Sequence, residues 1–204
     1  MIQRRLTISA AVFAISLGFW THRGQSDEQP VGKTEVPKYI PQYTDGGELK
    51  LPSKFREWIF VGAALGLRYS EHGPYEDEEK FTNVYITPPA YAQFQRTGTF
   101  PEKTMLAMAV YRQGKKKPLG KRKLQGAFEG EFLAVELAVK DRANSKDAWT
   151  YFDFSPQEGQ TALRKSAKAF ATNKCFDCHA EHGAVDNVFV QYYPALRRLQ
   201  KPTK

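Results

Sequence analysis

Residues Met105–Arg112 (MLAMAVYR) and Leu124–Lys140 (LQGAFEGEFLAVELAVK) decide the fold class of this chain. Both stretches are rich in apolar residues, and a short basic segment separates them, so we expect two strands that pair as antiparallel neighbours. Gly126 and Gly130 are the expected positions of bulges in the second stretch, which forms one bent strand or two. Its end, residues 132–139, is also compatible with a helix on propensity alone.

Other strands and helices follow on both sides of this pair. We expect a short helix from Ser53, as its cap, to Trp58, a strand or helix at Ile59–Leu67, strands at Phe81–Thr87 and Trp149–Phe154, a helix from Pro88-Pro89 to about Arg96, and a helix at Gln160–Thr172. Strands come first and the clearest helix comes last. This order predicts an α+β fold with an antiparallel sheet and a few helices.

The N-terminus has the pattern of an export signal. Arg4 and Arg5 precede an apolar run from Leu6 to Trp20, and a helix of this run would be shorter than the hydrocarbon core of a bilayer. We therefore expect residues 1–26 to be a signal peptide that sends the protein to the periplasm. No clear cleavage site follows the run, so an uncleaved N-terminal membrane anchor stays open.

The remaining chain divides into a linker and one domain. Residues 27–50 are rich in Pro and Gly, and we expect residues 51–204 to form the domain. Seven of the twelve residues from Arg112 to Lys123 are Lys or Arg, in a chain of net charge +8. This segment is either a solvated loop or a docking patch for an acidic redox partner. An exported chain without a nucleic-acid-binding motif is not expected to bind nucleic acid.

The C-terminal part contains Cys175-Phe176-Asp177-Cys178-His179, which is the C-x-x-C-H pattern of c-type haem attachment. Two thiols at this spacing reach the two vinyl groups of one porphyrin, and the next residue supplies an imidazole to the iron. We therefore expect one covalent haem c, held by Cys175 and Cys178, with His179 as the iron ligand. Covalent attachment of haem occurs outside the cytoplasm, in agreement with the export signal.

Three other functions of these residues are less well supported. A thioredoxin-like pair follows a strand, whereas Cys175 and Cys178 follow the helix predicted at Gln160–Thr172. Cys175, Cys178, His179 and His182 could bind zinc, but zinc modules usually separate their two ligand pairs by a longer loop. A disulfide between residues three apart would close too small a loop to stabilise the fold much.

The tail resembles a known family of haem proteins. The haem motif, followed by Asp186-Asn187-Val188-Phe189-Val190-Gln191-Tyr192-Tyr193-Pro194, is similar to the end of the cytochrome P-460 family, which includes the gas-binding cytochromes c′-beta. Further similar stretches occur in the same order over about residues 51–198, namely Leu51-Pro52, Phe55-Arg56, Trp58, Asn83–Ile86, Thr97-Gly98, Phe100, Gly130–Phe132, Val139–Asp141, Trp149 and Tyr151-Phe152.

The resemblance implies a sheet-rich haem domain with five-coordinate iron, commonly a homodimer. The cytochrome P-460 branch oxidises hydroxylamine to nitrous oxide and has a lysine bonded to the porphyrin. The position that matches this lysine is Met108, and Lys103 is expected to point to the opposite face of the strand. The cytochromes c′-beta lack the lysine and bind nitric oxide in an apolar pocket, so Met108 makes this chain more similar to them.

Two residues have expected roles beside the haem. Glu136 matches the position of a distal carboxylate in the catalytic branch and could relay protons, although alternation along its strand also allows it to face water. Met108 is a core residue, lines the haem pocket, or binds the iron through its thioether.

Three functions follow from these expectations. The first is binding of nitric oxide or a similar small ligand by a five-coordinate haem. The second is an enzyme that oxidises hydroxylamine, with Glu136 as its catalytic residue. The third is an electron carrier whose iron is also bound by Met105 or Met108.

Overall fold

The computed structural model describes residues 38–67, 79–114, 126–143, 145 and 147–197. The expected signal or anchor at residues 1–26 and most of the basic segment therefore lie outside the described residues. Within the described part, no helix has the length and apolarity needed to cross a membrane.

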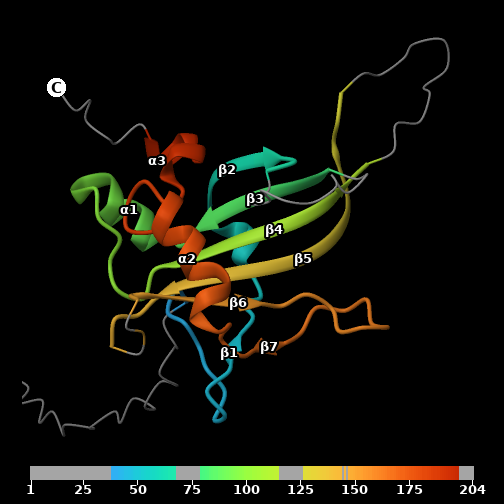
Figure 1. Ribbon diagram of the computed structural model, residues 1–204, viewed down its shortest axis with the longest axis horizontal. Coiled ribbons are helices and arrows are strands. Elements are labelled where there is room, and N and C mark those ends of the chain that lie inside the picture. The colour runs from blue at the N-terminus through green and yellow to red at the C-terminus, as the bar shows by residue number, and fades with distance from the viewer. Residues whose placement is uncertain (1–37, 68–78, 115–125, 144, 146, 198–204) are drawn as a thin grey trace, which may run out of the picture. The chain divides into compact units, whose positions relative to one another are not determined.

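The centre of the domain is a five-stranded antiparallel sheet (Figure 1). Its strands follow one another in chain order: β2 (Ile59–Leu65), β3 (Lys80–Ile86), β4 (Met105–Gln113), β5 (Glu129–Lys140) and β6 (Trp149–Asp153). The two stretches that decide the fold class are the neighbours β4 and β5, and β5 is one continuous strand rather than two. The sheet and helices together confirm the predicted α+β class.

The helices are short and lie around the sheet. They are η1 (Phe55–Glu57), α1 (Pro88–Thr97), α2 (Thr172–His182), η2 (Val190–Tyr192) and α3 (Pro194–Arg197). Helix α1 begins at the predicted prolines and ends at Gly98, whose φ of 72° is readily adopted by glycine. The prediction of Ser53 as a helix cap is wrong, because η1 begins after Lys54 and has no side-chain cap.

The prediction of a helix at Gln160–Thr172 is also wrong. Within this segment Ser166–Ala167 form a short strand, β7, that pairs with β1 (Leu49–Lys50). The Arg164 backbone amide donates to the Phe154 carbonyl oxygen, and the Phe170 backbone amide donates to the Tyr151 carbonyl oxygen. These contacts with other parts of the chain satisfy groups that an isolated helix would pair internally, and they override the local propensity.

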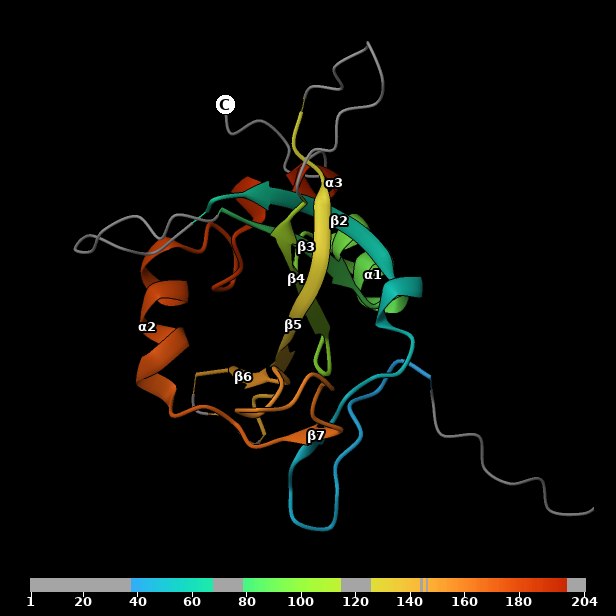
Figure 2. The same ribbon diagram turned by 90° about the vertical axis from the view of Figure 1, so that its right-hand side faces the viewer.

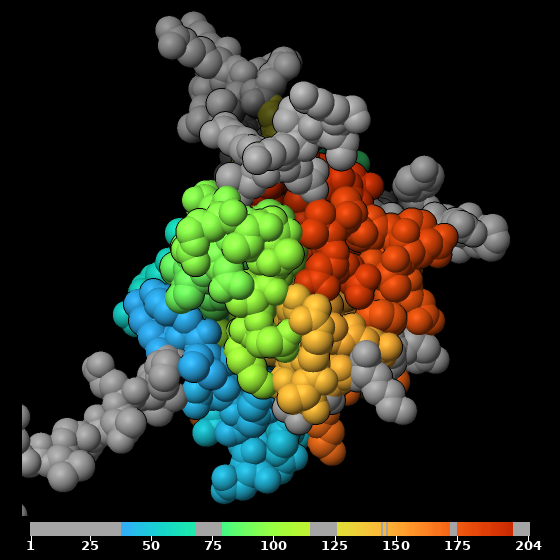
Figure 3. Space-filling model, turned by 90° about the vertical axis from the view of Figure 1, so that its left-hand side faces the viewer, coloured from blue at the N-terminus to red at the C-terminus, as the bar shows by residue number. Residues whose placement is uncertain are grey.

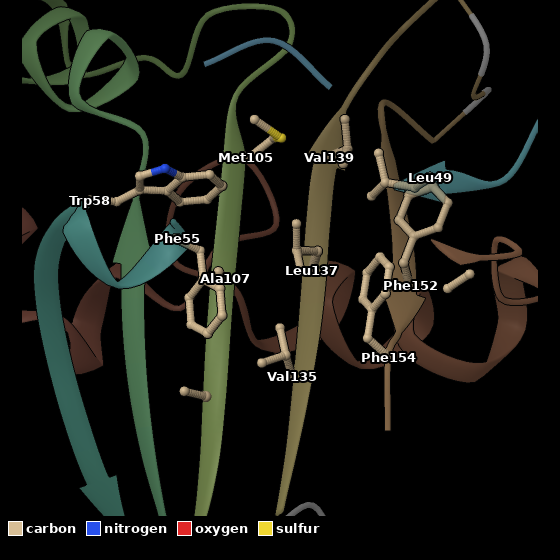
Figure 4. Packing of buried hydrophobic residues seen from close by; sticks show 12 residues of the cluster. Leu49, Phe55, Trp58, Met105, Ala107, Val135, Leu137, Val139, Phe152 and Phe154 are labelled. Carbon is tan, nitrogen blue, oxygen red and sulfur yellow. The ribbon is translucent and has the colours of Figure 1, made fainter. Parts of the chain in front are cut away.

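Packing covers both faces of β4 and β5. On one face, odd-numbered residues such as Met105, Leu137 and Val139 pack with Phe55 and Trp58 (Figure 4). Leu49 is fully buried in this cluster, so residues before the expected boundary at residue 51 contribute to the core. Helix α2 lies on the other side of the strands (Figure 2). The sheet thus separates a closed apolar core from the side that faces α2.

Candidate haem site

Helix α2 places the residues of the haem motif on one cavity. Cys175, Cys178 and His179 occupy positions i, i+3 and i+4 of the helix, which share one helical face. All three line a cavity of about 450 Å³, and the two cysteines are thiols that do not form a disulfide. The motif therefore lies inside a helix rather than after one, and its position no longer argues against a thioredoxin-like redox pair. The residues around the motif must distinguish such a pair from a haem site.

The cavity wall is mainly apolar and aromatic, as in pockets that bind organic ligands. Besides the haem motif it is lined by Val84, Leu106, Met108, Glu136, Leu137, Ala138, Trp149, Tyr151, Phe152, Phe170, Asn187, Val188, Phe189 and Tyr193. Strands β3 to β6, helix α2 and the segment after it all contribute to this list. A cavity of this kind fits a flat apolar macrocycle, and helix α2 supplies the two thiols and the imidazole that line it.

The His179 ring is fixed in one orientation and protonation state. Its Nδ1 lies 2.9 Å from the Asn187 carbonyl oxygen, and the ring packs against Tyr151 and Phe189. A carbonyl only accepts hydrogen bonds, so Nδ1 holds the proton and Nε2 keeps its lone pair. Burial lowers the pKa of His179, which outweighs the opposite effect of the Asn187 hydrogen bond. This shift favours the neutral imidazole, which is the form that binds a metal.

A tight turn after α2 supplies the Asn187 carbonyl. Asp186 and Asn187 have positive φ angles of 50° and 60°, and Val185 and Val188 pair on either side of them. Gly183 lets this turn approach the helix, because a Cβ there would lie 2.5 Å from both the Asn187 carbonyl carbon and the His179 oxygen. A side chain at position 183 would therefore push the turn away from the histidine.

The sheet wall of the cavity contains the other two predicted site residues. Met108 on β4 and Glu136 on β5 are direct partners in the strand register, and both line the cavity. Although the Glu136 side chain is accessible in the open cavity, the surrounding protein atoms reduce its hydration. This desolvation raises the pKa of Glu136, and the Asp153 carboxylate on β6 adds to the effect.

The raised pKa of Glu136 predicts a pH effect on stability. Between its ordinary pKa and its folded pKa, the folded protein holds more protons than the unfolded chain, so the free energy of unfolding falls as pH rises through this window. We expect Glu136→Gln to flatten this decline at pH values above the ordinary glutamate pKa of about 4, measured by denaturant unfolding of the haem-loaded protein. The matched control is Glu131→Gln, an exposed glutamate of the same strand. Equal slopes for wild type and Glu136→Gln would contradict the prediction.

Several other predicted residues do not reach the cavity. Met105 is buried in the core on the other face of the sheet, so its proposed role as an iron ligand is wrong. Lys103 precedes β4, and its ammonium binds the Asp141 carboxylate. Among the described residues that line the cavity, none is a lysine. The described region thus offers no amine to bond to a porphyrin in this cavity.

His182, the fourth candidate zinc ligand, does not line the cavity with the other three. His182 is exposed and its Nε2 lies 3.7 Å from a Glu181 carboxylate oxygen. Within the described part of the chain, no group of three or more His, Cys, Asp and Glu residues is arranged to hold a metal ion.

An α+β domain with the C-x-x-C-H motif on the wall of an apolar cavity has the features of a haem domain. The family model of cytochrome P460 matches residues 52–190, so the chain belongs to the cytochrome P460 family and is a haem-binding cytochrome. A search of curated proteins found no match to this chain.

Proposed function

We propose that this chain carries one haem c bonded to Cys175 and Cys178, with His179 as the only protein ligand of the iron. We further propose that it binds nitric oxide or a similar small ligand, like the cytochromes c′-beta. One observation carries this proposal: a single cavity joins the thiols and imidazole on α2 to a sheet wall with Leu106 and Met108 and without a lysine among its described residues.

Each group of residues has a distinct task in this function. The cysteines hold the macrocycle in place by thioether bonds, and the Asn187 carbonyl keeps the His179 lone pair available. The side chains of β3 and β4 that line the cavity, such as Val84 and Leu106, give it an apolar wall. A haem held by these residues would supply the iron to which the small ligand would bind.

A second candidate function is hydroxylamine oxidation, and Glu136 favours it. This carboxyl group lines the cavity and has a raised pKa, as expected of a residue that accepts protons near neutral pH. The absence of a cavity lysine among the described residues argues against this activity, because the cytochrome P-460 branch has its porphyrin bonded to lysine.

A third candidate is electron transfer, with Met108 as a second iron ligand. Met108 lines the cavity from the sheet wall. A thioether bond to the iron would raise the reduction potential and close the site to small ligands.

Carbon monoxide binding distinguishes these functions. We expect the ferrous protein to bind carbon monoxide without a slow displacement step, because no protein group occupies the sixth position, and stopped-flow absorbance measures the rate. Met108→Leu, which keeps an apolar side chain of similar size, should bind at a similar rate. A thioether-to-iron absorption band in the ferric wild type that disappears in Met108→Leu would contradict the proposal and favour the electron carrier.

Export to the periplasm, a homodimer and an acidic redox partner for the basic segment stay predictions. The first agrees with haem attachment outside the cytoplasm. The residues expected to direct export, and most of the basic segment, lie outside the described part of the chain.

A further inference from the structure

Lys140 is a buried cation that the function above does not use. It is the last residue of β5 and is 2% exposed. Its Nζ donates to the Phe100 carbonyl oxygen at 2.7 Å and to the Asp186 carboxylate at 2.5 Å. A buried ammonium group is costly unless it is paired in this way. Figure 3 shows the segments after α1, around residue 140 and after α2 packed together at this end.

The carboxylate that Lys140 binds belongs to Asp186, in the turn that orients the His179 ring. Asp186 immediately precedes Asn187, whose carbonyl oxygen accepts the hydrogen bond from His179 Nδ1. Both turn residues have positive φ, a conformation that non-glycine residues adopt at some energetic cost. Contacts from outside must therefore hold the turn, and the ion pair with Lys140 fixes the residue next to the carbonyl.

We propose that Lys140 is a positioning residue for His179. Its ion pair with Asp186 holds the Asn187 carbonyl at the distance and angle at which its oxygen accepts a hydrogen bond from the imidazole N–H. This inference rests on the proposed function, in which His179 binds the haem iron. A strong hydrogen bond at Nδ1 raises the basicity of the ligating nitrogen and thus strengthens the iron–histidine bond. The Lys140–Asp186 ion pair therefore strengthens the iron–histidine bond, although β5, the strand of Lys140, supplies no iron ligand.

The iron–histidine stretching frequency of the ferrous protein, measured by resonance Raman spectroscopy, tests this proposal. Lys140→Met keeps a long apolar side chain but removes the ion pair, so the carbonyl moves and the frequency should decrease. Asp186→Asn keeps the shape and a residue type that tolerates positive φ, but replaces a charged hydrogen bond by a weaker neutral one. It should lower the frequency as well, by a smaller amount.

The two variants separate positioning from the electric field of the charges. Removing the lysine and removing the aspartate change the local charge in opposite directions, so a field effect would shift the stretching frequency in opposite directions. Loss of positioning lowers the stretching frequency in both. Frequency shifts of opposite sign would overturn the proposal. An unchanged frequency in Asp186→Asn would overturn it even if Lys140→Met does not fold.

Lys103→Met is the matched control. Lys103 forms an ion pair with Asp141, the residue next to Lys140, whereas Asp186 forms its ion pair with Lys140. The control should keep the wild-type frequency, and an equal shift in it would overturn the proposal. A wild-type band that is unchanged in Lys140→Met overturns only the role of Lys140. Absence of the band from the wild type overturns histidine ligation and this inference together.

Discussion

The double substitution of Cys175→Ala and Cys178→Ala should abolish covalently bound haem. Both thiols lie on the cavity face of α2, and they are the only cysteines of the chain, so no other thioether can form. Haem staining after denaturing electrophoresis should fall from full intensity to background at equal protein load. Each single variant should retain at most one thioether bond and stain more weakly.

Asp177→Asn is the control for this experiment. Asp177 lies between the two cysteines, but its side chain is exposed and does not line the cavity. The control should stain like the wild type, which shows that a change within the motif does not by itself prevent attachment. Staining that survives the double cysteine substitution would mean that another residue bonds to the haem.

The substitution His179→Ala should remove the axial ligand and leave the haem attached. The cysteine thioethers do not depend on the imidazole, so haem staining should persist. The iron–histidine stretching band should disappear, and the ferrous absorption spectrum should change with the coordination of the iron. Added imidazole should restore much of the wild-type spectrum, because the substitution leaves space in the cavity that His179 lines.

His182→Ala is the matched control, because this second histidine lies on the same helix, three residues further on. Its ring is exposed and paired with Glu181. The control spectrum should equal that of the wild type. If His182→Ala rather than His179→Ala removed the band, the iron ligand would be His182 and the assignment to His179 would be wrong.

The sheet could be predicted from the sequence because its signals are local. Apolar runs bounded by turns indicate β4 and β5, and the prolines indicate the start of α1. The segment at residues 160–172 could not be predicted, because its conformation depends on pairing of Ser166–Ala167 with Leu49–Lys50, more than one hundred residues away in the chain. Helix propensity depends only on residues that are close in the sequence and does not include such long-range contacts.

The site was predictable where a motif defines it and not where the fold assembles it. The C-x-x-C-H spacing predicts Cys175, Cys178 and His179 as haem-binding residues without a structure, and all three line one cavity. Lys140 was missed because it pairs with Asp186, 46 residues along the chain. The only local signal for the turn was the Asp-Asn pair itself, since these residue types adopt positive φ more readily than most. Met105 and Met108 could be separated only when the strand register showed which face lines the cavity.

Intact mass spectrometry of the purified wild-type protein, followed by peptide mapping, tests whether the haem is bonded to the two cysteines. We predict the mass of the processed polypeptide plus one haem, with the haem on the peptide that contains Cys175 and Cys178 and on no other. Unmodified cysteines would contradict covalent attachment. A further loss of hydrogen, with the haem also bonded to a peptide containing Lys103 or Lys80, would contradict attachment through the cysteines alone and would favour the hydroxylamine-oxidising function instead.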